Sequence, residues 1–237
     1  MTNFYDILKN VCTLIHEENP GSFDNIGSPY PEIKQYIKTV ADEVCSKFPW
    51  TFREKKYSFN TVAAQREYAL PSGCAAINII KDGIRISGLV QPLYFILHSD
   101  LDILVQTSGK PDKYSVYASK LILDPTPDAV YSVQMKYLTS NYATSADGAT
   151  EKANFDLETD ISIIPERFIK IIEWGAYSLY RQNFKPDSKY QLARDKFLEY
   201  LSDMKRFDGY GKDASPTVVI NRKPDPNSRF ISDFFSA

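Results

Sequence analysis

The sequence predicts an α+β fold: a helical bundle built from an N-terminal and a C-terminal helix pair, with an inserted antiparallel β region and an extended C-terminal tail. Three observations predict it. Apolar residues recur at helical spacing near both ends of the chain. Between Tyr57 and Thr139, short alternating runs are separated by Gly, Pro and Asp. After Arg206 this periodicity stops.

These changes of pattern divide the chain into parts. We expect residues 1–52 and 161–206 to form the helical bundle and residues 53–139 to form the inserted β region. We expect residues 140–160 to be a polar loop and residues 207–237 to be the extended tail. With 237 residues, the chain is long enough to bury a substantial core.

Two helices are predicted before the β region. Residues 3–17 carry Phe4, Ile7, Leu8 and Val11 on one stripe, which is typical of an amphipathic helix. A break rich in Pro, Gly and Asn follows, and a second helix is expected to start near Ser28 and to end by residue 48.

The β region opens with a predicted hairpin. Tyr57 and Phe59 alternate with polar residues, residues 63–66 are polar, and Tyr68 and Leu70 form the return strand. Ser99 and Asp102 resemble a capping box, which predicts one helix inside the region. Further strands are expected at residues 76–80, 84–90, 114–118, 121–123 and 129–138.

Two more helices follow the loop, one from Pro165 to Phe184 and one from Pro186 to about Arg206. The tail after them is too aromatic for an inert linker, so we predict that it binds a partner, although folding back onto its own domain is an equal alternative. The predicted partner-binding residues are Arg222, Arg229, Phe230, Phe234 and Phe235.

Composition and charge limit the function. The net charge of -2 excludes a broadly basic nucleic-acid coat. Three widely spaced cysteines argue against a disulfide framework. The first residues lack the pattern of a signal peptide, and no stretch approaches the ~20 apolar residues of a membrane span.

Candidates for chemistry are weak. Cys12 and His16 are four residues apart but lack further metal ligands, and residues 156, 158 and 160 lack the glycine and distal Glu of a calcium loop. Cys74 has no base nearby in the sequence. We therefore predict that the protein is not an enzyme and that it binds neither a metal nor a cofactor. The basic residues of the last two helices alternate with acids, which favours a salt-bridged solvent face.

Taken in order, short motifs across residues 30–185 resemble the head-to-tail adaptor (connector) proteins of tailed bacteriophages, especially the short-tailed type. This family commonly has Gly in the turn of the second motif, where the chain has Ala63 and Ala64. The motifs are FPWTF (48–52), FNTVAAQREYALP (59–71), GKPDKY (109–114), LDPTP (123–127) and IPERF (164–168).

The resemblance implies a virion structural protein that forms a ring of twelve subunits beneath the portal protein. The ring would extend the DNA channel and seat the tail nozzle or tail fibre proteins. Separately from the resemblance, the basic residues of the last two helices leave weak, sequence-independent contact with passing DNA as an open alternative to a salt-bridged face. The expected location is the head–tail junction of the virion, after assembly in the host cytoplasm and without a membrane. The alternative is a β-type ligand-binding module of a phage or bacterial protein, also without catalytic activity.

Overall fold

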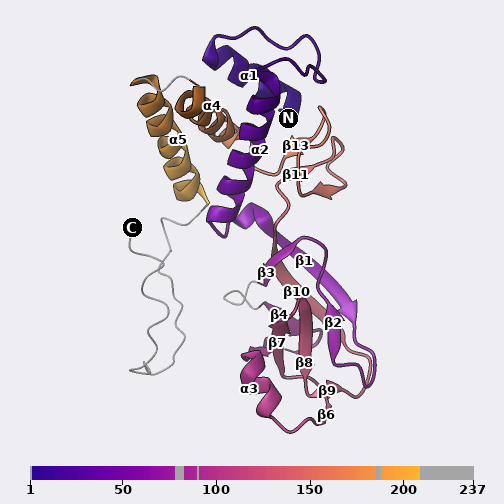
Figure 1. The fold of residues 1–237 in the computed structure, drawn as a ribbon. Coiled ribbons are helices and arrows are strands. Elements are labelled where there is room, and N and C mark those ends of the chain that lie inside the picture. Colours follow the sequence, from indigo (N-terminus) through magenta and orange to yellow (C-terminus); the bar gives the residue numbers. More distant parts are fainter. Residues whose placement is uncertain (1, 78–82, 90, 185–187, 209–237) are drawn as a thin grey trace, which may run out of the picture.

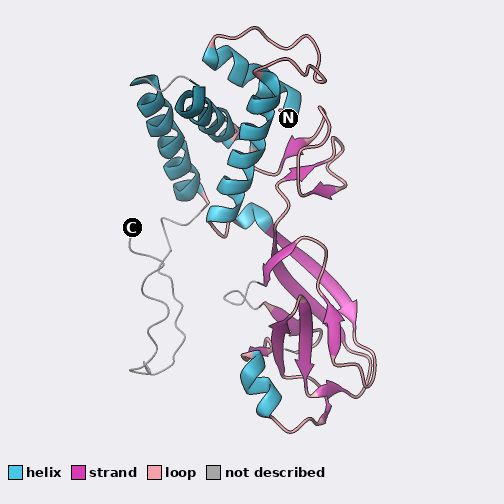
Figure 2. Cartoon of the chain, viewed as in Figure 1, coloured by secondary structure: helices cyan, strands magenta, loops and turns pink. Residues whose placement is uncertain are grey.

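The computed structural model of the chain describes residues 2–77, 83–89, 91–184 and 188–208. In these ranges the molecule is elongated, with the long helices at one end and most of the strands at the other (Figure 1). Figure 2 shows the same separation by secondary structure. The α+β class predicted from the sequence is confirmed.

Four helices form what we call the helical end, and they share one hydrophobic core. Of these, α4 contacts each of the other three. All four predicted helical segments are present, with bounds within a few residues of the prediction, while the bundle arrangement and the domain limits stay predictions. The helices are α1 (Phe4–Ile15), α2 (Tyr30–Lys47), α4 (Lys170–Phe184) and α5 (Ser188–Phe207), and the short 3-10 helix η2 (Glu166–Phe168) precedes α4.

Local caps set the limits of α1. The side chain of Asn3 accepts a hydrogen bond from the backbone N–H of Asp6 at 2.8 Å, which satisfies one of the free donors of the first turn. At the other end His16 has a φ of 62°, and the N–H of Glu17 donates to the carbonyl of Cys12 at 3.0 Å. This left-handed residue stops the helix shortly before the predicted limit of residue 17.

Helices α2 and α4 pack closely because Gly175 has no side chain. A Cβ added at Gly175 would lie 2.5 Å from Cγ1 of Val40 on α2. Glycine in a helix interior costs up to about 1 kcal/mol relative to alanine, so its use here is explained by the contact rather than by helix propensity.

What we call the β end contains two four-stranded sheets that share a second core, a separate pair of two-residue strands, and helix α3 (His98–Ile103). In the first sheet the central strand β10 (Ser132–Thr139) pairs with β1 (Glu54–Asn60), β3 (Cys74–Ile77) and β4 (Ile84–Ile86). The second sheet has the order β2 (Glu67–Ala69), β8 (Lys120–Asp124), β7 (Lys113–Tyr117) and β5 (Tyr94–Phe95).

The β end is mainly antiparallel, as predicted, but not entirely. The pairs β5–β7 and β6 (Ser108–Gly109)–β9 (Thr126–Pro127) are parallel. One face of β10 points into the second core, since Val133 and Met135 are buried and Tyr137, with Tyr131 just before the strand, packs against the same core.

The predicted hairpin is wrong. Strand β1 pairs with β10 along its whole length, and β2 pairs with β8 in the other sheet. The polar segment between them crosses from one sheet to the other, and the hydroxyl of Tyr68 donates to the carbonyl of Gln65 at 2.8 Å within it. Alternation identified both strands correctly, but it carries no information about which strand each one pairs with.

The segment 140–160, predicted as a polar loop, contains strands, so that prediction is also wrong in part. It contains the short strands β11 (Ala143–Thr144) and β12 (Glu151–Lys152), which form a small antiparallel sheet with β13 (Ile161–Ser162). This sheet lies against the start of α1, because Asn3 forms a bridge with Ile161. Strands of two residues are too short to show a periodic pattern in the sequence.

The helix inside the β end is present, but its predicted cap is wrong. Helix α3 begins at His98 after Leu97, and no side chain caps its first turn. The hydroxyl of Ser99 instead lies 3.4 Å from the carboxylate of the neighbouring Asp100.

Candidate functional surfaces

The chain crosses between the two ends of the molecule at a junction built around Trp50. This side chain is fully buried, and its indole N–H donates to the carbonyl of Val44 at 2.6 Å. The ring packs between Phe48 and Phe52, with centroid distances of 5.1 and 5.8 Å. The aromatic cluster therefore fixes the direction in which the chain leaves α2.

Arg53, in the 3-10 helix η1 (Thr51–Arg53), ties this junction together. The side chain is buried, and burial lowers the pKa of its guanidinium. It donates to the carbonyls of Cys45 and Phe48 at the end of α2, and its Nε–H donates to the carbonyl of Thr139 at 2.8 Å. One planar group thus satisfies carbonyls at the last turn of α2 and at the end of β10.

The last turn of α5 completes the junction. The carboxylate of Asp208 accepts hydrogen bonds from the backbone N–H of Thr51 at 2.9 Å and from its hydroxyl. The ammonium of Lys205 lies 3.7 Å from the ring centroid of Phe48. The pKa of Lys205 is lowered, mainly by burial and further by the positive charge of the nearby Lys47. The chain therefore leaves the described structure beside η1.

A cavity of about 270 Å³ opens at this place, and we call it the junction cavity. Its wall combines apolar side chains with cationic groups, and Arg53 forms part of it. The cavity is lined by Ser46, Lys47, Phe48, Pro49, Arg53, Ala75 and Leu138.

The outer face of the first sheet of the β end is basic. Lys56 on β1 lies directly opposite Lys136 on β10, and Gln134 lies opposite Arg85 on β4. Together with Ser58 and Met135 these residues line a cavity of about 340 Å³. Neither Lys56 nor Lys136 forms an ion pair with a described residue. The face is therefore suited to an anionic partner.

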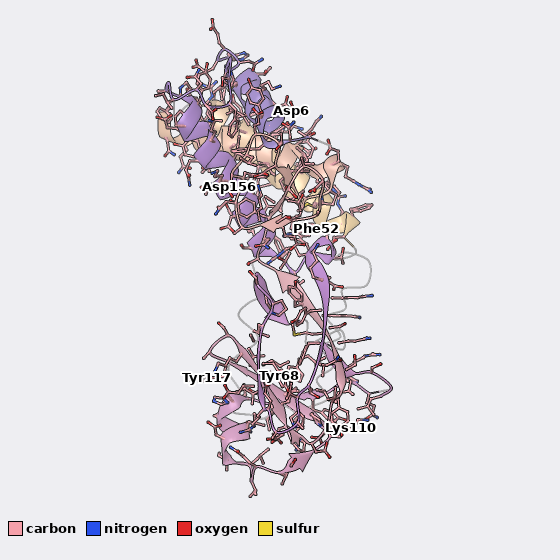
Figure 3. All side chains as sticks on the ribbon, turned by 90° about the vertical axis from the view of Figure 1, so that its right-hand side faces the viewer. Asp6, Phe52, Tyr68, Lys110, Tyr117 and Asp156 are labelled. Carbon is pink, nitrogen blue, oxygen red and sulfur yellow. The ribbon has the colours of Figure 1, made fainter. Side chains whose placement is uncertain are left out.

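The tip of the β end exposes apolar side chains. Ile103 at the end of α3 is 81% exposed, and nearby Val105 is 84% exposed. Tyr94, Leu97 and Tyr117 are also largely exposed: Leu97 directly precedes α3, Tyr117 lies on β7, which contacts α3, and Tyr94 lies on β5, which pairs with β7. Tyr117 lies at the opposite end of the molecule from Asp6 (Figure 3). Exposed apolar groups at one place are typical of a contact with another protein.

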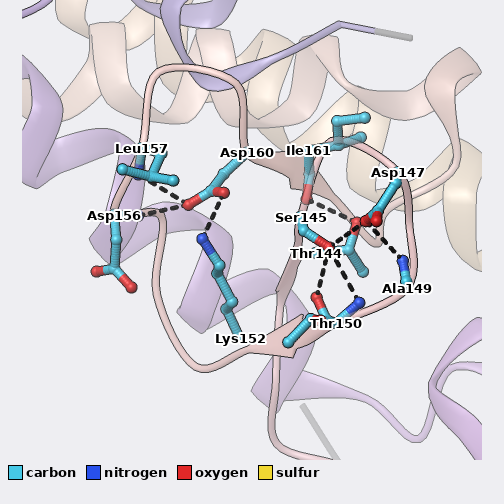
Figure 4. A network of polar contacts seen from close by, with 10 residues as sticks. All are labelled: Thr144, Ser145, Asp147, Ala149, Thr150, Lys152, Asp156, Leu157, Asp160 and Ile161. Carbon is cyan, nitrogen blue, oxygen red and sulfur yellow. Dashed lines mark hydrogen bonds and ion pairs between the residues drawn. The ribbon is translucent and has the colours of Figure 1, made fainter.

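The acidic residues 156, 158 and 160 form a folded loop. The buried carboxylate of Asp160 accepts the backbone N–H groups of Asp156 and Leu157 at 2.7 and 2.9 Å and the ammonium of Lys152 at 2.7 Å (Figure 4). Burial acts to raise the pKa of Asp160, but these hydrogen bonds and Lys152 outweigh it and lower the pKa. Asp156 and Glu158 are exposed, so the three carboxylates do not converge.

The cysteines do not form a site either. Cys12 is buried in the helical core, whereas His16 is exposed beyond the end of α1. Cys74 is half-buried, and burial raises the pKa of its thiol. Within the described ranges no cluster of His, Cys, Asp and Glu could hold a metal ion. Likewise, no described helix combines the length and apolar character needed to cross a bilayer.

The basic residues of the last two helices are partly paired with acids. Lys196 contacts Glu199 at 2.7 Å, and Arg206 contacts Asp203. Arg181 is buried and donates to the hydroxyl of Tyr177 at 3.1 Å. The two ion pairs, each spaced by three residues, agree with the predicted salt-bridged solvent face, whereas the buried Arg181 does not belong to it.

All five predicted partner-binding residues of the tail, from Arg222 to Phe235, lie outside the described residues. Local sequence patterns did not identify Arg53, the basic sheet face or the apolar tip. An arginine among aromatic residues, directly after a helix, is a signal that could have identified Arg53 as a junction residue.

Comparison with known protein families identifies a match. A family model described as SU10 adaptor protein matches residues 2–220. This range covers nearly the whole chain and agrees with the family resemblance of the sequence motifs. No curated protein matches the chain.

Proposed function

Since the chain belongs to the SU10 adaptor family, a family of phage adaptor proteins, we propose that it forms a ring beneath the portal protein of a virion. The ring has twelve subunits, extends the DNA channel, and seats the tail nozzle or tail fibre proteins. The protein acts by binding and not by catalysis, at the head–tail junction, and it takes part in genome ejection after assembly in the host cytoplasm.

The observation that supports this proposal best is the two-ended shape joined through a buried arginine (Figure 1). An adaptor has to contact one neighbour above and another below while keeping a fixed distance between them. Repeated around an axis, a head-to-tail contact between such subunits closes into a ring when its rotation permits.

The two ends then have separate partners. We assign the predicted tail residues, from Arg222 to Phe235, to the portal, because the chain leaves the described structure at the junction near the helices. We assign the apolar tip around Ile103 and Val105 to a component of the phage tail, because this tip lies at the end of the molecule far from α1.

Contact with passing DNA is the role that we propose for the basic sheet face. Lys56 and Lys136 carry adjacent positive charges, and phosphate groups would neutralise them. Contacts to phosphate carry no sequence information, so this binding would be non-specific and would weaken as the salt concentration rises.

Native mass spectrometry of the chain with a purified portal ring tests the proposal. We expect up to twelve chains on each portal ring, and a chain that stays monomeric with the portal present would contradict the proposal. A variant with Ile103→Glu and Val105→Glu should still bind the portal but fail to recruit the tail component. Ile26→Glu is the matched control, because Ile26 is 90% exposed elsewhere in the molecule.

A further inference from the structure

We propose that the junction cavity is the docking site for residues 230–235 of the chain's own tail, with the sequence FISDFF, in the protein before assembly. The docking itself is inferred from the cavity, its charges and the place where the chain leaves the described structure. Only its consequence for assembly rests on the proposed function.

The size and lining of the cavity suit aromatic side chains. At about 270 Å³ it is slightly smaller than pockets for drug-sized ligands, so it matches one or two side chains. Phe48, Pro49 and Leu138 supply apolar surface that is only partly covered in the described structure. Phe48 is backed by Trp50, which gives the wall a rigid aromatic base.

The charges around the cavity suit an acidic residue among those aromatic residues. Lys47 lines the cavity, and Lys205 lies over Phe48 at its wall. Lys47 lies 3.6 Å from Glu43 in an exposed pair, whereas no carboxylate of a described residue pairs with Lys205. Asp233, in the middle of the aromatic segment, supplies the missing negative charge.

The path of the chain favours the tail of the same molecule over that of a second copy. The carboxylate of Asp208 is held by Thr51, two residues after the cavity-lining Pro49. From Asp208 to Phe230 there are 22 peptide units, which span at most ~75 Å, so the segment easily reaches this cavity. A tethered segment has an effective concentration in the millimolar range, well above that of a second copy in dilute solution.

Docking would have a consequence for assembly. Of the residues that we assign to the portal, Phe230, Phe234 and Phe235 would be covered in the free protein, because one aromatic side chain cannot fill two sites at once. The portal then has to compete for the tail, which limits ring formation to the place where a portal is present.

Disulfide trapping in the full chain tests the docking. In a Cys74→Ser background, Ala75→Cys places a thiol at the cavity, and Ser232→Cys places one in the tail segment. The native Cys12 and Cys45 should not compete, because burial raises their pKa values to about 11 and about 12. The matched control replaces Ala75→Cys with Ala63→Cys, at an exposed alanine far from the cavity.

We expect the Ala75→Cys pair to form an intramolecular disulfide at least about tenfold faster than the Ala63→Cys pair, at a rate independent of protein concentration. Adding Phe234→Ser, which leaves the described structure untouched, should remove most of this advantage. Equal rates for the two pairs, or disulfide-linked dimers in place of the intramolecular product, would overturn the proposal. The assay needs no portal. Failure of the docking proposal can therefore be distinguished from failure of the proposed function, which the portal-binding experiment tests.

Discussion

The Nε–H of Arg53 donates a hydrogen bond to the carbonyl of Thr139 at 2.8 Å, and this bond joins the segment that enters the β end to the segment that leaves it. Because the same guanidinium also binds carbonyls at the end of α2, it couples the helical end to the β end. A molecule that bridges two neighbours needs such a coupling, since a loose junction would not keep them at a fixed distance.

Replacing Arg53 by lysine should destabilise the protein. Lysine keeps the positive charge, but it lacks the planar guanidinium group that donates to carbonyls on two elements at once. The buried carbonyls would therefore lose hydrogen-bond donors. We expect the free energy of unfolding in urea to fall by about 1–3 kcal/mol. The matched control is Arg206→Lys, at an exposed arginine, which should change it by less than about 0.5 kcal/mol. Equal small effects at both positions would contradict this role of Arg53.

Replacing Ala64 by glycine should stabilise the protein. Ala64 has a φ of 64°, a left-handed conformation that costs a residue with a Cβ roughly 1–2 kcal/mol. Part of this gain is lost to the greater backbone freedom of glycine when unfolded, so a net gain of up to about 1 kcal/mol is expected in urea unfolding. Ala63→Gly, next to it, lacks a strained conformation to relieve and should give no gain. If both variants lose stability equally, the strain at Ala64 is absent.

Replacing Lys56 by glutamate should also stabilise the isolated protein. Lys56 lies opposite Lys136, and like charges in this arrangement repel, whereas the variant creates an attractive pair worth about 0.2–1 kcal/mol. Thermal unfolding at low salt should show the gain, and added salt should reduce it. Lys55→Glu is the control with the opposite sign, because Lys55 pairs with Glu151. A loss of stability in Lys56→Glu would show that another group already balances these charges.

Replacing Glu173 by glutamine should stabilise the protein at neutral pH. Burial raises the pKa of Glu173, against the hydrogen bond that Asn10 donates to it at 2.7 Å. A carboxyl group with a raised pKa in the folded state costs stability when ionised, and the cost disappears as the pH falls below its unfolded pKa of about 4.3. Urea unfolding at pH 7 and at pH 3.5 should therefore show a gain only at pH 7. A gain of equal size at both values would exclude titration as its cause.

The sequence predicted what depends on local pattern. Helices α1, α2, α4 and α5 were found because each buries one stripe of its own residues, as Ile7 and Val11 do on α1. The pairing of β1 was not found, since its partner β10 lies more than seventy residues later and nothing in the sequence of β1 identifies it. The junction cavity was missed for the same reason, because it brings Phe48 and Leu138 together from distant segments.

Electron microscopy of purified portal rings mixed with the chain tests the adaptor function most directly. The proposed function predicts an additional layer on one axial face of the portal, with rotational symmetry, a continuous central channel and twelve copies of the chain. Portal rings that look the same with and without an excess of the chain would contradict it.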